Sequence, residues 1–276
     1  MHRILLLAAT LLAALPARAQ VPDTLVEVER PRTWRGAPVV QRALLAKPSA
    51  AATTALLWFR GKPGIVRIDR STVRHPHLGP LRQHQRLLFQ AGIALVVVDC
   101  PSDQLEPTHA WSDGCDDEYR ESAQHAEDVR ALISALRGQH GLERFFIMGH
   151  SKGTMSSRWL AVHLGNEIAG SIHSAAINVN TKVITRGHAA AGAIPRIATP
   201  MLHIHHERDG CVATPYAIVA RYAKDNLVTV RGGTPSGDPC GGMHHHSHGG
   251  REEAVVRAVV DWITAGKVTP VAGAPD

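Results

Sequence analysis

Residues 144–153 read RFFIMGHSKG, an apolar run that leads directly into a turn of the form G-x-S-x-G. The run predicts a buried strand, and the residues after the turn are compatible with a helix. Gly149 and Gly153 lack a β-carbon, so neighbouring chain can pass close to them while Ser151 is held in a strained conformation at the carboxyl edge of a sheet. This context makes Ser151 the candidate nucleophile, and the plain alternative is a glycine-rich turn without chemistry.

The rest of the chain repeats this alternation of strand and helix. Short apolar runs alternate with segments of helical periodicity, which is typical of a mostly parallel sheet covered by helices on both faces. We therefore predict an α/β fold. The expected parallel strands are residues 55–59, 93–98, 144–148, 170–175, 201–205 and 227–230. The expected helices are residues 81–91, 126–136 and 254–262.

Two further features concern the edges of this fold. Residues 25–29 and 39–45 resemble two antiparallel edge strands that precede the parallel ones. Only residues 177–199 separate the strand at 170–175 from the next strand, so we expect no large lid domain and an open site. The composition shows no linker between domains, and residues 20–276 are interpreted as a single domain.

A serine hydroxyl needs a base to accept its proton and a carboxylate to orient that base. Behind an elbow of this kind, the acid and then the base follow the serine along the chain. Asp209 lies just after the strand 201–205, where a carboxylate would sit at the carboxyl end of the sheet, and Gly210 and Cys211 follow it as a tight turn. Asp209 is therefore the candidate acid. A solvated turn aspartate is the alternative, and Glu207 is the second choice.

The loop after the last strand contains the candidate base. It carries four histidines, namely His244, His245, His246 and His248. We expect His248 to be the base, because it directly precedes two glycines and the helical run that starts at Arg251; His246 is the second choice. The other histidines are interpreted as an exposed tract with loose metal affinity, and no structural metal or cofactor is expected. His203 and His205 share one face of a strand and are interpreted as sheet residues near the site.

Two backbone amides would bind the oxyanion that forms when such a serine attacks a carbonyl. Lys152, at the start of the helix after the serine, is expected to supply the first amide. The second is expected from the loop 60–64 that follows the strand 55–59, at Gly61 or Lys62. An ordinary R-G-K-P-G turn is the structural alternative for that loop.

The chain has four cysteines, Cys100, Cys115, Cys211 and Cys240, and no C-x-x-C spacing. An even set without that spacing favours disulfides over zinc or redox sites in an exported protein. Three pairings are possible. We expect Cys211 to pair with Cys240, because that bond would join the loop of Asp209 to the loop of His248, which leaves Cys100 with Cys115.

The first residues predict export. His2 and Arg3 precede an apolar run over residues 4–15, and an Ala-Arg-Ala sequence ends at Ala19. This pattern is typical of a signal peptide over residues 1–19, cleaved after Ala19, and the run is shorter than the roughly 20 residues of a membrane span. We expect a periplasmic or secreted protein with no membrane span in the mature chain.

Composition argues against nucleic acid as a partner. The formal net charge is +6, the lysines and arginines are scattered, and aromatic residues make up 4% of the chain. Neither a basic stripe nor an aromatic platform for bases is present. Nucleic acid is therefore not an expected partner.

Together these residues resemble the α/β-hydrolase superfamily, and within it small exported or bacterial hydrolases related to dienelactone hydrolases and esterases. The resemblance covers residues 55–264. Besides the elbow it rests on VVVDCPSD at 96–103, HHERDGC at 205–211 and SHGG at 247–250. The family's last segment usually reads His-Gly followed by an aromatic residue, and Gly250 departs from that pattern.

The resemblance implies cleavage of an ester, thioester or amide through an acyl-enzyme on Ser151. His248 would move the proton, and Lys152 with Gly61 would bind the oxyanion. Carboxylic-ester hydrolysis is the leading hypothesis, and the expected partner is a small-molecule ester or a short peptide. A peptidase for short peptides, a catalytically inactive hydrolase fold that binds a ligand, and a metal-handling role of the histidine-rich loop are the alternatives.

Overall fold

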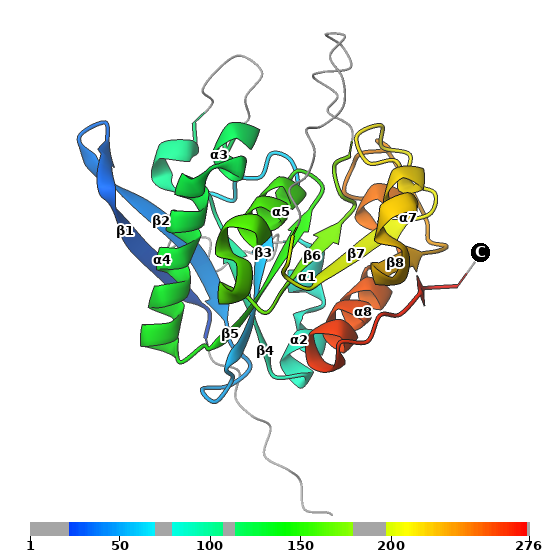
Figure 1. Ribbon diagram of the computed structural model, residues 1–276, viewed down its shortest axis with the longest axis horizontal. Coiled ribbons are helices and arrows are strands. Elements are labelled where there is room, and N and C mark those ends of the chain that lie inside the picture. The colour runs from blue at the N-terminus through cyan, green and yellow to red at the C-terminus, as the bar shows by residue number, and fades with distance from the viewer. Residues whose placement is uncertain (1–21, 70–78, 107–113, 179–196, 275–276) are drawn as a thin grey trace, which may run out of the picture.

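The structure, a computed structural model, describes residues 22–69, 79–106, 114–178 and 197–274. Within these ranges, nine strands form one sheet in the order β1-β2-β4-β3-β5-β6-β7-β8-β9 (Figure 1). The strands are β1 (Thr24–Trp34), β2 (Ala37–Ala46), β3 (Thr54–Phe59), β4 (Ile93–Val98), β5 (Arg144–His150), β6 (Gly170–Ser174), β7 (Met201–His206), β8 (Leu227–Val230) and β9 (Val271–Ala272). The expected signal peptide at residues 1–19 lies outside the described residues.

The sheet is mostly parallel. The pairs from β4 through β3 to β9 are parallel, whereas β1 pairs with β2, and β2 with β4, in the antiparallel sense. The predicted α/β class and the six predicted parallel strands are confirmed. The two predicted antiparallel strands at the N-terminal side are also present, but only β1 is an edge strand, since β2 lies between β1 and β4. Strand β9 lies at the other edge of the sheet. It is too short for its periodicity to be recognised in the sequence.

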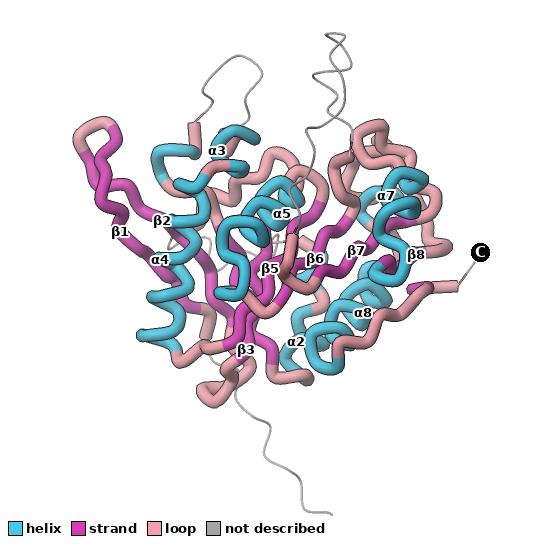
Figure 2. Tube along the Cα trace, viewed as in Figure 1, coloured by secondary structure: helices cyan, strands magenta, loops and turns pink. Residues whose placement is uncertain are grey.

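Helices cover both faces of the sheet (Figure 2). Helices α4 and α5 pack on one face, and α1, α2 and α8 pack on the other. The described α-helices are α1 (Pro80–Gln83), α2 (Gln85–Gln90), α3 (Asp117–Glu121), α4 (Ala123–His140), α5 (Gly153–Leu164), α7 (Tyr216–Ala223) and α8 (Glu252–Ala265). The segment 81–91, predicted as one helix, is divided into α1 and α2 at His84.

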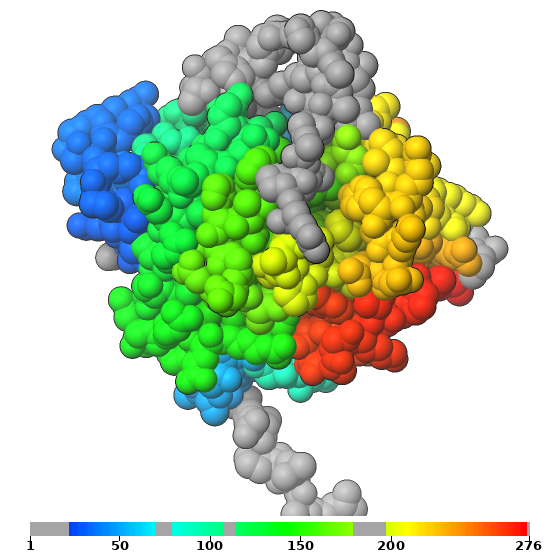
Figure 3. Space-filling model, in the orientation of Figure 1, coloured from blue at the N-terminus to red at the C-terminus, as the bar shows by residue number. Residues whose placement is uncertain are grey.

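The central strands are buried on both sides. Along β3, Leu56 and Trp58 join the core layer under α8, whereas Leu57 and Phe59 join the layer under α4 and α5. Successive side chains of a strand point to opposite faces, so a strand covered on both faces must be apolar throughout. In Figure 3 the β1–β2 hairpin (blue) forms one side of the molecule and α8 (red) lies toward the other.

The carboxyl ends of β3, β5, β6 and β7 meet at one edge of the sheet. Phe59 is in register with Gly149, and His150 with Ser174, so the loops that follow these strands start side by side. The expected absence of a large lid concerns the connection from β6 to β7, of which residues 179–196 lie outside the described residues. This edge therefore gathers the candidate residues from separate parts of the chain.

Candidate active site

Ser151 occupies a sharp turn between β5 and α5. Its φ of 51° is in the left-handed region, which non-glycine residues rarely adopt. Its amide donates to the carbonyl oxygen of Ser174 at 2.9 Å. A β-carbon at Gly149 would collide with the carbonyl of Gly153, and one at Gly153 would collide with that of Phe59. Both glycines are therefore required by close packing, as the G-x-S-x-G pattern predicts.

The two residues expected to supply oxyanion amides are close to this serine. Lys152 follows Ser151 directly and is the N-cap of α5, at the positive end of the helix dipole. The loop after β3 passes close to the serine, since a β-carbon built on Gly61 would lie 3.1 Å from the Cβ of Ser151. Both residues are thus next to the place where a substrate carbonyl would meet Ser151.

Asp209 follows β7 and its side chain is completely buried. The Cys211 amide donates to Oδ1 at 2.9 Å, and Thr214 Oγ1 donates to Oδ2 at 2.8 Å. His246 Nδ1 and His205 Nε2 each lie 3.1 Å from the same Oδ2. Burial by itself raises the pKa of Asp209, but the hydrogen bonds from His205 and His246 outweigh it and hold that pKa well below its usual value.

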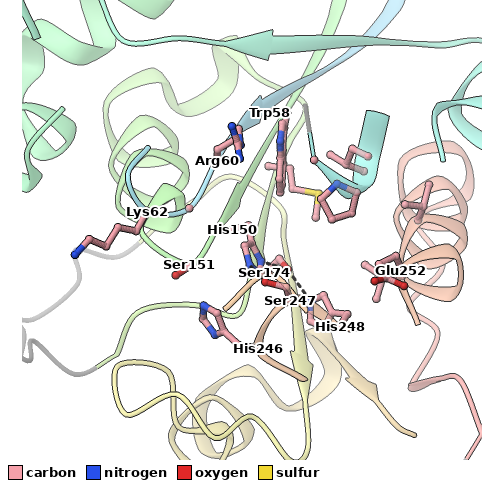
Figure 4. Close-up of a pocket in the computed structure, with 18 of the residues that line it drawn as sticks. Trp58, Arg60, Lys62, His150, Ser151, Ser174, His246, Ser247, His248 and Glu252 are labelled. Atoms are coloured by element: carbon pink, nitrogen blue, oxygen red, sulfur yellow. Dashed lines mark hydrogen bonds between the residues drawn. The ribbon is translucent and has the colours of Figure 1, made fainter. Parts of the chain in front are cut away.

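His246 is the histidine of the loop that meets this carboxylate. Its Nδ1 lies 3.1 Å from Asp209 Oδ2 and 3.0 Å from Thr214 Oγ1. Ser151 and His246 line the same cavity, in which Figure 4 shows both side chains. Among the described residues no hydrogen bond joins Ser151 to His246, a contact that often closes only when substrate is bound.

His248, the first choice from the sequence, has different partners. Its Nε2 lies 2.8 Å from Ser174 Oγ, and its Nδ1 is buried with no hydrogen-bond partner in the described part of the chain. The chain folds into a short 3-10 turn over His245–Ser247, and His248 then takes a left-handed φ of 62°. This turn directs His246 toward Asp209 and His248 toward Ser174, so the geometry favours the second choice as base.

The histidine-rich loop is not the exposed tract expected from the sequence. His245, His246 and His248 are buried. The ring of His245 stacks on that of His206, with centroids 4.0 Å apart and planes 7° apart. Burial lowers the pKa of His248 to about 3 and also holds the pKa of His150 well below its usual value, so both rings are neutral at physiological pH.

His150, which sequence reasoning did not select, is at the centre of these side chains. Its Nδ1 lies 3.1 Å from Ser174 Oγ and its Nε2 lies 3.3 Å from Ser247 Oγ. Its ring also stacks on Trp58 and contacts His246. The only sequence signal was its place in the elbow next to the nucleophile.

Both disulfides join the pairs expected from the sequence. Cys211 is bonded to Cys240, which ties the turn of Asp209 to the histidine loop. Cys100 is bonded to Cys115. The Cα atoms of the two bonds are 4.6 and 6.0 Å apart, respectively.

A buried arginine connects the second disulfide to the loop that follows β3. Arg120 donates from Nε to the carbonyl of Cys115, from one terminal nitrogen to Ser156 Oγ, and from the other to the carbonyl of Gly64. Its burial lowers its pKa to about 10, so it stays charged. Nothing in the charged segment around Arg120 distinguishes it from a surface arginine, and sequence reasoning missed it.

Two further findings on the described residues concern metal binding and membrane spanning. Within them, no three or more histidine, cysteine, aspartate or glutamate side chains are grouped so as to hold a metal ion. No helix in those ranges has the length and apolarity needed to cross a membrane.

The mostly parallel sheet, the helices on both faces and the serine elbow after β5 define an α/β hydrolase. Residues 77–236 match the family described as serine aminopeptidase, S33, and the chain belongs to this family of serine hydrolases. The match ends before His246. The search of curated proteins gave no significant match.

Solved structures show the same fold at low identity. A putative α/β hydrolase from Agrobacterium tumefaciens is 11% identical, with a TM-score of 0.55 over 91% of this chain and 100% of the other. Est1E from Butyrivibrio proteoclasticus with ferulic acid bound is 17% identical, with a TM-score of 0.52 over 82% and 94%. A serine hydrolase without a lid from Xanthomonas campestris is 15% identical, with a TM-score of 0.50 over 87% and 92%.

Proposed function

We propose that the chain hydrolyses carboxylic esters, or thioesters, through an acyl-enzyme on Ser151, with His246 as the base and Asp209 as the acid. One observation carries the proposal. The buried carboxylate of Asp209 meets His246 Nδ1 at 3.1 Å, and His246 lines the same cavity as the left-handed Ser151. This is the nucleophile, base and orienting acid that acyl transfer needs.

The reaction would proceed in two stages. Ser151 Oγ attacks the carbonyl carbon while its proton moves to His246 Nε2, and the amides of Lys152 and Gly61 donate to the oxyanion. The tetrahedral intermediate collapses, and the leaving alcohol departs with the proton from His246. Water then attacks the acyl-enzyme while His246 accepts one of its protons. The bond between the acyl carbon and Ser151 Oγ breaks, His246 returns the proton to Oγ, and the acid leaves. Asp209 keeps its charge and stabilises the imidazolium.

Peptide hydrolysis is the second candidate, because the matching family is described as serine aminopeptidase. The same three residues serve both reactions, which differ in the leaving group. Esters and anilides of one acyl group, for example p-nitrophenyl butyrate and butyryl p-nitroanilide, distinguish them in parallel assays. We expect measurable turnover of the ester, and faster turnover of aminoacyl anilides than of any ester would favour the peptidase.

The control for either activity is Ser151→Ala. Removal of the nucleophile should lower kcat by about three orders of magnitude or more while the circular dichroism spectrum is unchanged. Ester turnover retained by Ser151→Ala would contradict the mechanism.

We also propose that the chain is exported and that residues 20–276 form one mature domain. The basic start, the apolar run and the Ala-Arg-Ala sequence before residue 20 support cleavage after Ala19, and two disulfides fit an oxidising compartment. Mass spectrometry of the protein expressed with its own N-terminus in a bacterium should give a first residue of Gln20 in the periplasmic fraction. Recovery of the full-length chain from the cytoplasm would contradict this.

A further inference from the structure

The cavity beside Ser151 continues toward the helices on the opposite side from α4 and α5. Its volume is about 180 Å³. Beyond Ser151 and His246, its walls come from β3, α1, β5 and α8. The apolar lining side chains are Trp58, Pro80, Leu81, Met148, Val255 and Val256.

The apolar walls of the cavity are part of the packed core. Except for Pro80, the apolar lining residues are buried and belong to the main core under α8; Leu81 is 2% exposed and Val256 is 1% exposed. Trp58 forms a flat wall that stacks on the neutral ring of His150, with centroids 6.2 Å apart. A closely packed core resists expansion, so the part of the cavity that these apolar side chains line has a limited size.

The residues that line the cavity differ in exposure. Cys240 and Gly242, in the loop of His246, are exposed, whereas Trp58, Leu81 and Val256 are buried. Figure 4 shows Trp58 and Glu252 on the far side of His150 from Lys62. The charged lining residues Arg60, Lys62 and Glu252 are half-buried or exposed, whereas the apolar lining side chains other than Pro80 are buried.

The chemistry of acyl transfer distinguishes the two substituents of the ester. His246 must protonate the leaving oxygen, so the alcohol has to lie on the same side of Ser151 as His246. The buried apolar part of the cavity is then left for the substituent on the carbonyl carbon.

We propose that this buried apolar part of the cavity is an acyl subsite for one compact, uncharged, apolar group, about the size of a phenyl ring or a short alkyl chain. This inference rests on the proposed ester hydrolysis and names its substrate class. An apolar cavity of about 150 Å³ is sufficient for benzene. The whole cavity, including the part around Ser151, measures about 180 Å³, so its apolar part suits a benzoyl, butyryl or hexanoyl group and excludes a dodecanoyl chain.

The experiment measures kcat/KM for p-nitrophenyl acetate, butyrate, hexanoate, benzoate and dodecanoate. We expect the benzoate and the short-chain esters to exceed the dodecanoate by about tenfold or more, which is the discrimination that a full apolar pocket gives. A second series of acetates with ethanol, butanol and benzyl alcohol should show little dependence on the alcohol.

Two variants change the subsite in opposite directions. Val256→Phe should fill it and lower kcat/KM for benzoate and hexanoate about tenfold or more relative to acetate. Val255→Ala should widen it and move the preference toward longer or branched acyl groups. Val259→Ala is the matched control, because Val259 is a buried valine of the same helix that does not line the cavity, and its acyl profile should equal that of the wild type.

The outcomes separate this inference from the proposed function. If a fluorophosphonate labels Ser151 and esters are hydrolysed, but the acyl profile is flat, the acyl subsite is wrong and the function stands. The same holds if Val255→Ala leaves the profile unchanged, or if the alcohol series responds instead. If Ser151 is not labelled and no ester is hydrolysed, both proposals fail.

Discussion

Asp209 accepts hydrogen bonds from one backbone amide and three side chains, which uses about all the acceptor sites of a carboxylate. The Nε2 atom of His205, which contacts Asp209, also lies 2.7 Å from the carbonyl oxygen of Thr214. Because a carbonyl oxygen can only accept a hydrogen bond, this Nε2 carries a proton. Thr214 itself donates to Asp209. The carboxylate is therefore fixed in orientation and in charge before any substrate binds, and His205, interpreted from the sequence as a sheet residue, is one of its positioning groups.

The lowered pKa of Asp209 makes a prediction about stability in acid. The pKa is lower in the folded than in the unfolded chain, so the carboxylate contributes stability above its unfolded value of 3.8, and that contribution is lost as the pH falls through the folded value. The free-energy difference in unfolding between wild type and Asp209→Asn should therefore be largest near pH 7 and decrease below about pH 5.

Urea denaturation of both proteins at several pH values measures this difference. Asp225→Asn, at an exposed position, is the control and should give a small, constant difference. A difference for Asp209→Asn that stays constant or grows as the solution is acidified would contradict the account.

At the scale of elements, the site depends on loops from four strands that are held by a few specific links. Cys211–Cys240 joins the loop after β7 to the loop before α8. Arg120 joins α3 to the loop after β3 and to α5. The strands and helices follow from apolar periodicity, whereas these links depend on single residues.

The disulfide prediction concerns both stability and activity. Cys211 and Cys240 are 29 residues apart, so their replacement by serine should lower the free energy of unfolding by about 3 kcal/mol. Measured where the variant is fully folded, kcat/KM should also fall by about tenfold or more, because the alignment of Asp209 with His246 is relaxed. A stability loss with unchanged kcat/KM would show that the disulfide does not align the site.

Arg120→Lys should be strongly destabilising. A lysine presents a single ammonium group in place of the planar fork that reaches three acceptors, and acceptors left without a partner in a buried place cost free energy. We expect the free energy of unfolding to fall by about 3 kcal/mol.

The matched control is Arg130→Lys, at an exposed ion pair with Glu167, where we expect a change of less than about 1 kcal/mol. Chemical denaturation of both variants gives the comparison. Equal losses would mean that the buried position of Arg120 has no special role.

At the scale of the whole molecule, the fold could be predicted from the sequence, but the detail of the site only in part. Alternating apolar runs predicted the parallel strands, and the G-x-S-x-G turn predicted the elbow, because both depend on local pattern. The choice between His246 and His248 depends on a left-handed residue at the end of a short turn, which no periodicity reveals. Arg120 and Thr214 are brought to their partners by tertiary packing alone.

The pairing of Ser151, His246 and Asp209 is tested most directly by the rate at which a fluorophosphonate labels Ser151. The rate is measured for the wild type, His246→Ala and His248→Ala, and mass spectrometry identifies the labelled residue. We predict labelling at Ser151 that is slowed by orders of magnitude in His246→Ala, since loss of the base removes the activation of the serine, and much less in His248→Ala. The opposite ranking of the two variants, or a folded wild-type protein that is not labelled at Ser151, would contradict the account.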